Sequence, residues 1–357
     1  MKTSKRNLKS FIIFSLTMIS GLLTVEIFLR LTEISLPSYV YDDPKLGRTF
    51  RPNAKIFRAD AEGFCISQVN KYGYLGKPYD REKNRDSLRI CLVGDSFVEG
   101  MQVFDRNHFR TILENELKQG LNRNVEVLNF GIGGIDFRVM YFIYSQRILE
   151  FNPDIVLFFV KDDDFLSADV LPAPEIIVRD NELAIDYSFL NNAESKLRRT
   201  FKIVRNFSLG NLSKEAFEQF YLGRFWKIVL DKMNFLLAKG QKQEPIHQPQ
   251  DRENDRYFGV NTKIIRQLDI DANKHGTRNI IIKVNSWPSY YSDILSREKI
   301  MVFDLESELA HYINDEIYFK AFEEFGHWNY FGHRIVADYL AKSILLLYDQ
   351  DKNCQKE

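Results

Sequence analysis

The chain has 357 residues, of which 45% are hydrophobic and 14% aromatic. This composition indicates a globular protein with a large core and excludes a disordered chain. Lysine plus arginine and aspartate plus glutamate both total 49, so the formal net charge is zero and gives no reason to expect a nucleic-acid partner. Cys65, Cys91 and Cys354 form no CxxC pair and have no metal-ligand spacing with histidine, which argues against a disulfide framework or a cysteine metal site.

The N-terminus has the pattern of a membrane anchor. Four basic residues precede an uncharged run from Phe11 to Val25, which continues past Glu26 to Leu29. As a helix this run would be about 28 Å long at about 1.5 Å per residue, close to the ~30 Å hydrocarbon core of a bilayer. The basic cluster predicts a cytoplasmic N-terminus, with the C-terminal part translocated to the periplasm or cell surface. No small-x-small cleavage site follows the run, which favours an uncleaved anchor over residues 1–31; a cleaved signal peptide is the alternative.

An alternation of strands and helices follows. Residues 32–86 are rich in aromatics, proline and glycine and predict an irregular lead-in with short strands. Apolar runs at 87–93, 125–129 and 154–160 predict buried strands, separated by helical patterns at 105–118 and around 140–149. Three strands joined by two helices predict a parallel, doubly wound sheet.

The alternation breaks between about 166 and 255. A hairpin is expected at 175–187, helical segments at 193–239 and a polar loop at 241–255, which together form an insertion into the sheet domain. A helix at 257–274, strands at 279–284 and 300–303, and a last helix at 329–347 then complete the pattern. The fold class is therefore α/β, a doubly wound, mostly parallel three-layer sandwich over residues 87–350.

A serine and a histidine have the context of a catalytic pair. Ser96 follows the first strand in Gly94-Asp95-Ser96, at the edge where open α/β sheets bind ligands. His327 lies just ahead of the last helix, in a segment expected to return to that edge. Glu324, three residues earlier, is expected to orient the imidazole. His333, about one turn into the helix, is interpreted as a packing or capping residue.

Three sequence blocks occur in order along the chain: Gly94-Asp95-Ser96, Asn129-Phe130-Gly131-Ile132-Gly133-Gly134, and Gly326 to Leu340. With them the chain resembles the SGNH (GDSL-type) hydrolase superfamily, in its bacterial membrane-anchored branch. The resemblance covers about 69–160 and 279–347. It implies the flavodoxin-like sandwich fold of the superfamily, Ser96 as nucleophile and His327 as base. It also implies that the backbone amides of Ser96 and Gly134 bind the oxyanion, and it implies no cofactor and no metal.

Two positions depart from the family pattern. The family's third block is Gly-x-Asn-Asp, and its asparagine donates to the oxyanion. Here the block is Lys161-Asp162-Asp163-Asp164, with Asp163 in the asparagine position. An ionised carboxylate only accepts hydrogen bonds and would repel an oxyanion. The second departure is Glu324, where the family usually has aspartate.

Three functions remain open at this stage. The first is a serine-dependent ester hydrolase or O-acyl transferase outside the cytoplasmic membrane, acting on O-acyl (often O-acetyl) groups of an envelope polysaccharide. The second is a degenerate domain that binds glycan or scaffolds an envelope complex without turnover, which Asp163 and the insertion favour. Metal-dependent phosphate chemistry at residues 162–164 is the third, but it leaves Ser96 and His327 unused. In the plainest interpretation, Gly94 and Gly134 are only turn glycines and His327 caps a helix.

Overall fold

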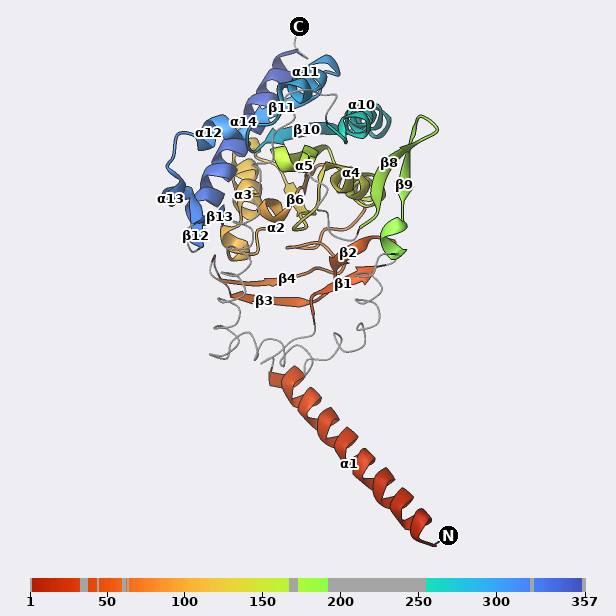
Figure 1. Cartoon of the computed structure of the whole chain (residues 1–357). Helices are drawn as coiled ribbons and strands as arrows, with labels where there is room; N and C mark the ends of the chain where they lie inside the picture. The colour runs from red at the N-terminus through yellow and green to blue at the C-terminus, as the bar shows by residue number, and fades with distance from the viewer. Residues whose placement is uncertain are drawn as a thin grey trace. The chain divides into compact units, whose positions relative to one another are not determined.

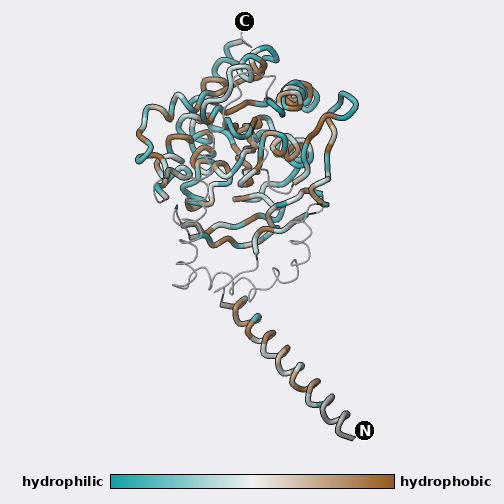
Figure 2. Tube along the Cα trace, in the orientation of Figure 1, coloured by the Kyte–Doolittle hydropathy of each residue, from teal (hydrophilic) through white to brown (hydrophobic). Residues whose placement is uncertain are grey.

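The computed structural model (Figure 1) describes residues 2–32, 38–43, 45–59, 62, 64–166, 173–191, 255–321 and 324–354. Helix α1, Lys2–Thr32, contains the 21-residue stretch Lys9–Leu29 with a mean hydropathy of 2.1. Hydrophobic residues run along most of α1 in Figure 2. In the described part of the chain this is the one helix long and apolar enough to cross a membrane. A signal sequence has the same features, so the anchor and the signal peptide both remain open.

A five-stranded parallel sheet forms the centre of the compact unit that comprises residues 42–195 and 247–357. Its strands are β5 (Leu88–Val93), β6 (Val125–Asn129), β7 (Ile155–Val160), β10 (Arg278–Lys283) and β11 (Met301–Asp304), in the spatial order β11-β10-β7-β5-β6. The predicted α/β class is confirmed. The order reverses between β5 and β7, and such a switch point is where doubly wound sheets bind ligands.

Helices cover the two faces of this sheet. The longest are α3 (Phe109–Leu121), α4 (Phe137–Gln146), α10 (Phe258–His275) and α14 (Tyr330–Cys354). Helices α3 and α14 pack together, and their apolar residues share one buried cluster with Leu88, Ile90 and Leu92 of β5. Every residue of β5, β6 and β7 is buried, as expected for strands covered on both sides.

Short elements connect these layers. The short helices are α2 (Ser96–Glu99), α5 (Asp162–Leu166), α11 (Ser289–Arg297), α12 (Leu305–Leu309) and α13 (Asn314–Ile317). The 3-10 turns are Asp105–Asn107, Ile148–Phe151 and Ser188–Asn191. The helix expected from residue 105 therefore begins at Phe109, where His108 accepts the Arg110 N–H as the N-cap.

Four two-stranded ribbons accompany the sheet: β1 (Val40–Asp43) with β2 (Gly47–Phe50), β3 (Lys55–Ala59) with β4 (Phe64–Gln68), β8 (Glu175–Arg179) with β9 (Glu182–Asp186), and β12 (Tyr318–Ala321) with β13 (Glu324–Trp328). The hairpin predicted in the insertion is confirmed as β8–β9. The helices predicted at 193–239 and the polar loop after them lie outside the described residues. His327 lies in β13, a strand rather than the expected loop.

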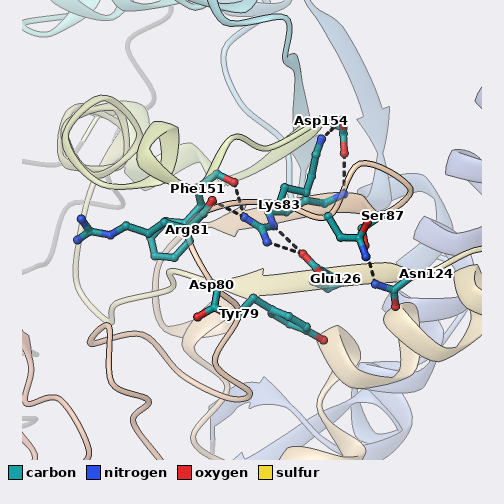
Figure 3. Close-up of polar contacts among 12 residues, drawn as sticks. Tyr79, Asp80, Arg81, Lys83, Ser87, Asn124, Glu126, Phe151 and Asp154 are labelled. Carbon is teal, nitrogen blue, oxygen red and sulfur yellow. Dashed lines mark hydrogen bonds and ion pairs between the residues drawn. The ribbon is translucent and has the colours of Figure 1, made fainter.

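A buried polar cluster connects the lead-in to the start of β5, the end of the strand away from Ser96. Figure 3 shows this cluster. Arg89, at the start of β5, is 1% exposed and binds the Glu126 carboxylate, with a 2.6 Å N–O contact. The same guanidinium donates to the backbone carbonyls of Arg81 and Phe151. Because the Arg81 carbonyl lies in the lead-in, this hydrogen bond ties the lead-in to the sheet.

Candidate active site

Ser96 stands where the first strand of the sheet ends. Asp95 caps helix α2, since its carboxylate accepts the Phe97 N–H at 2.9 Å, and Ser96 is the first residue of that helix. Gly94 packs so closely on β7 that an added Cβ would lie 3.0 Å from the Phe159 Cβ. The turn therefore requires glycine, and it holds Ser96 at the switch point between β5 and β7.

His327 bridges Ser96 and a carboxylate. Its Nε2 lies 2.7 Å from Ser96 Oγ, and its Nδ1 lies 2.6 Å from Glu62 Oε2. A carboxylate only accepts hydrogen bonds, so Nδ1 is the donor and Nε2 is left with its lone pair toward the serine hydroxyl. This is the serine–histidine–acid arrangement that activates a nucleophile.

The carboxylate at His327 Nδ1 is that of Glu62, whereas the sequence led us to expect Glu324 there. Glu62 lies 265 positions before His327, in the short link between β3 and β4. Glu324 is the first residue of β13, and its backbone pairs with Ala321. Glu324 was expected because it is close to His327 in the sequence. Glu62 is far from His327 in the sequence, and only the fold brings it to Nδ1.

Gly326 makes room for the Glu62 carboxylate. An added Cβ at this position would lie 2.0 Å from Glu62 Oε1 and 2.7 Å from its Cδ. The imidazole itself packs on the Phe97 ring, with the two ring centroids 5.0 Å apart. Trp328, the next residue, is fully buried and also contacts Phe97. The Phe97 ring that supports the imidazole is therefore itself held by a buried side chain.

The glycine block lies directly against α2. The Asn129 side chain accepts the Gly131 N–H at 2.8 Å and donates to the Val98 carbonyl at 2.8 Å. A Cβ on Gly131 would come within 2.3 Å of the backbone nitrogen of Glu99. A side chain on Gly131 would therefore displace the helix that carries Ser96.

Gly133 and Gly134 complete the turn beside Ser96. A Cβ on Gly133 would lie 3.4 Å from Ser96 Cβ, and Gly134 adopts a left-handed φ of 74°. The Gly133 N–H donates to the Glu99 carboxylate, whose pKa is raised because burial outweighs this hydrogen bond. Gly134 is thus in the region where the resemblance places the oxyanion glycine, and its role remains a prediction.

The acidic run after β7 has different partners for each member. Asp162 exchanges hydrogen bonds with the Asn285 side chain, and Asp163 lies 3.2 Å from the Lys161 ammonium. Asp164 is buried and accepts the Lys161 N–H at 2.7 Å. Burial first, and the Asp95 charge second, raise the pKa of Asp164 well above its ordinary value. Within the described ranges no three His, Cys, Asp or Glu side chains are grouped to hold a metal ion.

His333 has the structural role expected of it. It is 1% exposed, and its Nδ1 accepts the Phe109 N–H at 3.2 Å. Burial, and then the charges of His108 and His327, lower its pKa well below the ordinary value. His108 is also buried, and its pKa is lowered to about 3. Both imidazoles are neutral packing groups.

Comparison with known proteins gives structural neighbours only. No family model matches the sequence, and no curated protein matches it. The structure is similar to a lipolytic protein of the G-D-S-L family from Desulfitobacterium hafniense, with 13% identity, a TM-score of 0.37, and coverage of 71% of this chain and 98% of that one. An acetyl xylan esterase, AlAXEase, has 14% identity, a TM-score of 0.37 and coverage of 72% and 100%. The acetylxylan esterase Axe2 from Geobacillus stearothermophilus has 11% identity, a TM-score of 0.36 and coverage of 72% and 94%.

These TM-scores and identities carry no conclusion about substrate or mechanism. The fold rests on this chain's own sheet, whose order β6-β5-β7-β10-β11 is the flavodoxin-like order 2-1-3-4-5. In fold, the chain is a doubly wound α/β protein. The structure brings Ser96, His327 and the glycine block together, as the sequence predicts. Sequence reasoning missed Glu62, which belongs to no motif.

Proposed function

We propose that this protein is a serine-dependent ester hydrolase or O-acyl transferase in which Ser96, His327 and Glu62 form the catalytic relay. The observation that carries the proposal is the continuous pair of contacts from Glu62 Oε2 to His327 Nδ1 and from His327 Nε2 to Ser96 Oγ, of 2.6 and 2.7 Å. Such a relay serves to raise the nucleophilicity of a hydroxyl, which neither a binding module nor a turn requires.

In the acylation step, Ser96 Oγ attacks the acyl carbonyl carbon while His327 Nε2 takes the hydroxyl proton. The Ser96 and Gly134 backbone amides bind the oxyanion that develops, and Asp163 occupies the third position of that site. His327 then gives its proton to the leaving alkoxide as the acyl C–O bond breaks. Glu62 stabilises the imidazolium formed between these two transfers. Water, or a sugar hydroxyl in the case of transfer, then attacks the acyl carbon while His327 Nε2 takes its proton. The bond from the acyl carbon to Ser96 Oγ breaks, and His327 returns the proton to Ser96.

The substrate class follows from the expected location. If α1 remains as an anchor, the compact unit of residues 42–195 and 247–357 works outside the cytoplasmic membrane. There, O-acyl groups (above all O-acetyl groups) on an envelope polysaccharide are the accessible esters. The apolar stretch Lys9–Leu29 supports this placement.

Labelling with a fluorophosphonate probe tests the proposal, because this probe phosphonylates activated serines. We expect the full chain to be labelled at Ser96, as mapped by peptide mass spectrometry, and Ser96→Ala to be unlabelled. Ser343→Ala is the matched control, since that hydroxyl donates to a helix carbonyl at 2.9 Å, and its labelling should equal that of the wild type. A folded wild-type protein that remains unlabelled would refute catalysis.

A degenerate, glycan-binding domain is the second candidate, and Asp163 is the observation that favours it. Losing an oxyanion donor lowers turnover by about 100- to 1000-fold, which could abolish activity on a poor substrate. Asp163→Asn separates the two candidates. If the protein is an enzyme, ester hydrolysis by this variant persists or rises; if the domain only binds, both proteins are silent in hydrolysis and in labelling.

A further inference from the structure

Lys161 forms an ion pair with Asp163, the residue in the third oxyanion position of the proposed site. Val93 of β5 pairs with Phe158 of β7, so Ser96 and Lys161, each three residues further on, leave neighbouring strands at the same edge of the sheet. The Lys161 ammonium lies 2.8 Å from Asp95 Oδ2 and 3.2 Å from Asp163 Oδ1. The Lys161 and Asp95 side chains are 18% and 8% exposed, so water screens their contact only weakly, whereas the Asp163 side chain is 44% exposed and its contact is screened more.

The same ammonium and the His327 imidazole both contact the Phe97 ring. The ammonium lies 5.3 Å from the centroid of the Phe97 ring, and that ring is the one on which the His327 imidazole packs. Burial lowers the pKa of Lys161, but the carboxylates of Asp95, Asp164 and Asp163 outweigh burial and raise it above the ordinary value. The lysine therefore remains a cation throughout the pH range in which an esterase is assayed.

We propose that Lys161 is a positioning residue that allows this site to work with a carboxylate at position 163. The inference rests on the proposed esterase function. Within the Lys161–Asp164 block, two substitutions relative to Gly-x-Asn-Asp then compensate each other: Lys161 stands in place of the glycine, and Asp163 stands in place of the asparagine. The ammonium lies against both the Asp95 and the Asp163 carboxylates and offsets part of their negative charge, so the oxyanion that forms on Ser96 attack meets a paired carboxylate and not a free anion.

A double-mutant cycle tests this role on the full chain, with p-nitrophenyl acetate as substrate and fluorophosphonate labelling of Ser96 as a second readout. Lys161→Met keeps the bulk of the side chain and removes the charge. We expect kcat to fall about 100- to 1000-fold with little change in KM, because the uncompensated carboxylate opposes the transition state more than the bound ester. Lys161→Arg should retain most of kcat, because it keeps the charge.

The decisive variant is Lys161→Met combined with Asp163→Asn, which removes the cation together with the anion it neutralises and installs the amide donor. We expect Asp163→Asn to raise kcat at least about tenfold more in the Lys161→Met background than in the wild-type background, as strongly coupled neighbours do. A lysine with a merely structural role would show the same effect of Asp163→Asn in both backgrounds, and that result would overturn the role of Lys161.

Lys283→Met is the matched control. Lys283 ends the next strand of the sheet, binds Glu306 at 2.6 Å and lies 5.9 Å from the Trp287 ring centroid, with a side chain that is 23% exposed. We expect its kcat to equal that of the wild type. Lys161→Met with unchanged kcat, or a double variant no faster than Lys161→Met, overturns the role of Lys161 alone. A folded wild-type protein unlabelled at Ser96 overturns the proposed function, and the role of Lys161 with it.

Discussion

Gly326→Ala is expected to disconnect the base from its acid without unfolding the protein. The new Cβ would lie 2.0 Å from Glu62 Oε1, whereas ordinary contact begins at 3.4 Å, so the carboxylate must retreat by about 1.4 Å. That shift stretches the 2.6 Å contact with His327 Nδ1 beyond hydrogen-bonding range. The obstructing atoms are the end of a flexible side chain, and Gly326 does not adopt a positive φ. The backbone can therefore accept alanine.

The expected cost falls on turnover. Loss of the orienting acid lowers kcat of serine–histidine–acid enzymes by about 10⁴-fold. We therefore expect kcat of Gly326→Ala on p-nitrophenyl acetate to fall by about 100-fold or more, with a melting temperature close to that of the wild type. Gly259→Ala, at a helix position where no atom lies within 4 Å of the new Cβ, is the control and should retain full kcat.

The same substitution in a Glu62→Ala background separates this mechanism from a general disturbance. Once the carboxylate has been removed, the new methyl group has nothing to displace. Gly326→Ala should then lower kcat no further. The reasoning is refuted if Gly326→Ala retains wild-type kcat, or if it lowers kcat by the same factor with and without Glu62.

Further substitutions test the scaffold around the site. Glu126→Ala leaves the buried Arg89 guanidinium without its carboxylate, and urea unfolding should show a loss of about 3–5 kcal/mol; a loss below about 1 kcal/mol would contradict a buried pair. Gly131→Ala brings a Cβ to 2.3 Å from the Glu99 backbone nitrogen, so it should slow Ser96 labelling and lower the melting temperature, and a protein with both unchanged would argue against this close packing. The pKa of His108 is about 3 in the folded protein. Below pH ~6.5 the unfolded chain therefore binds more protons than the folded protein. The free energy of unfolding should fall by up to about 1.4 kcal/mol per pH unit as the pH drops below that value. His108→Gln should remove that contribution between pH 7 and 5, whereas equal pH slopes in the two proteins would show that His108 is not a buried neutral group.

The sheet was predictable because its physics is local. The runs at 87–93, 125–129 and 154–160 are mostly apolar, as is usual for strands buried on both faces, and each coincides with an observed strand to within a residue. The nucleophile and the glycine turn were predictable for a related reason. Close backbone approaches at Gly94 and Gly131 admit no side chain, which leaves a visible mark in the sequence.

The acid of the relay and the partner of Asp163 were not predictable in this way. Glu62 reaches His327 only because the β3–β4 ribbon is placed beside β13, and nothing near residue 62 in the sequence records that placement. The sequence drew attention to Asp163 but not to the ion pair it forms, since the direction of the Lys161 side chain depends on Asp95 in a neighbouring turn. Contacts between side chains from distant segments are set by tertiary packing, which local patterns do not encode.

Glu62 is proposed to orient His327 for attack by Ser96. A comparison of Glu62→Gln with Glu324→Gln tests this role directly. The measurement is kcat on p-nitrophenyl acetate together with the rate of Ser96 labelling, in folded protein at equal concentration. We expect Glu62→Gln to lower kcat and the labelling rate by about 100-fold or more. Glu324→Gln should leave kcat and the labelling rate unchanged. Slowing by Glu324→Gln together with wild-type rates for Glu62→Gln would contradict this role.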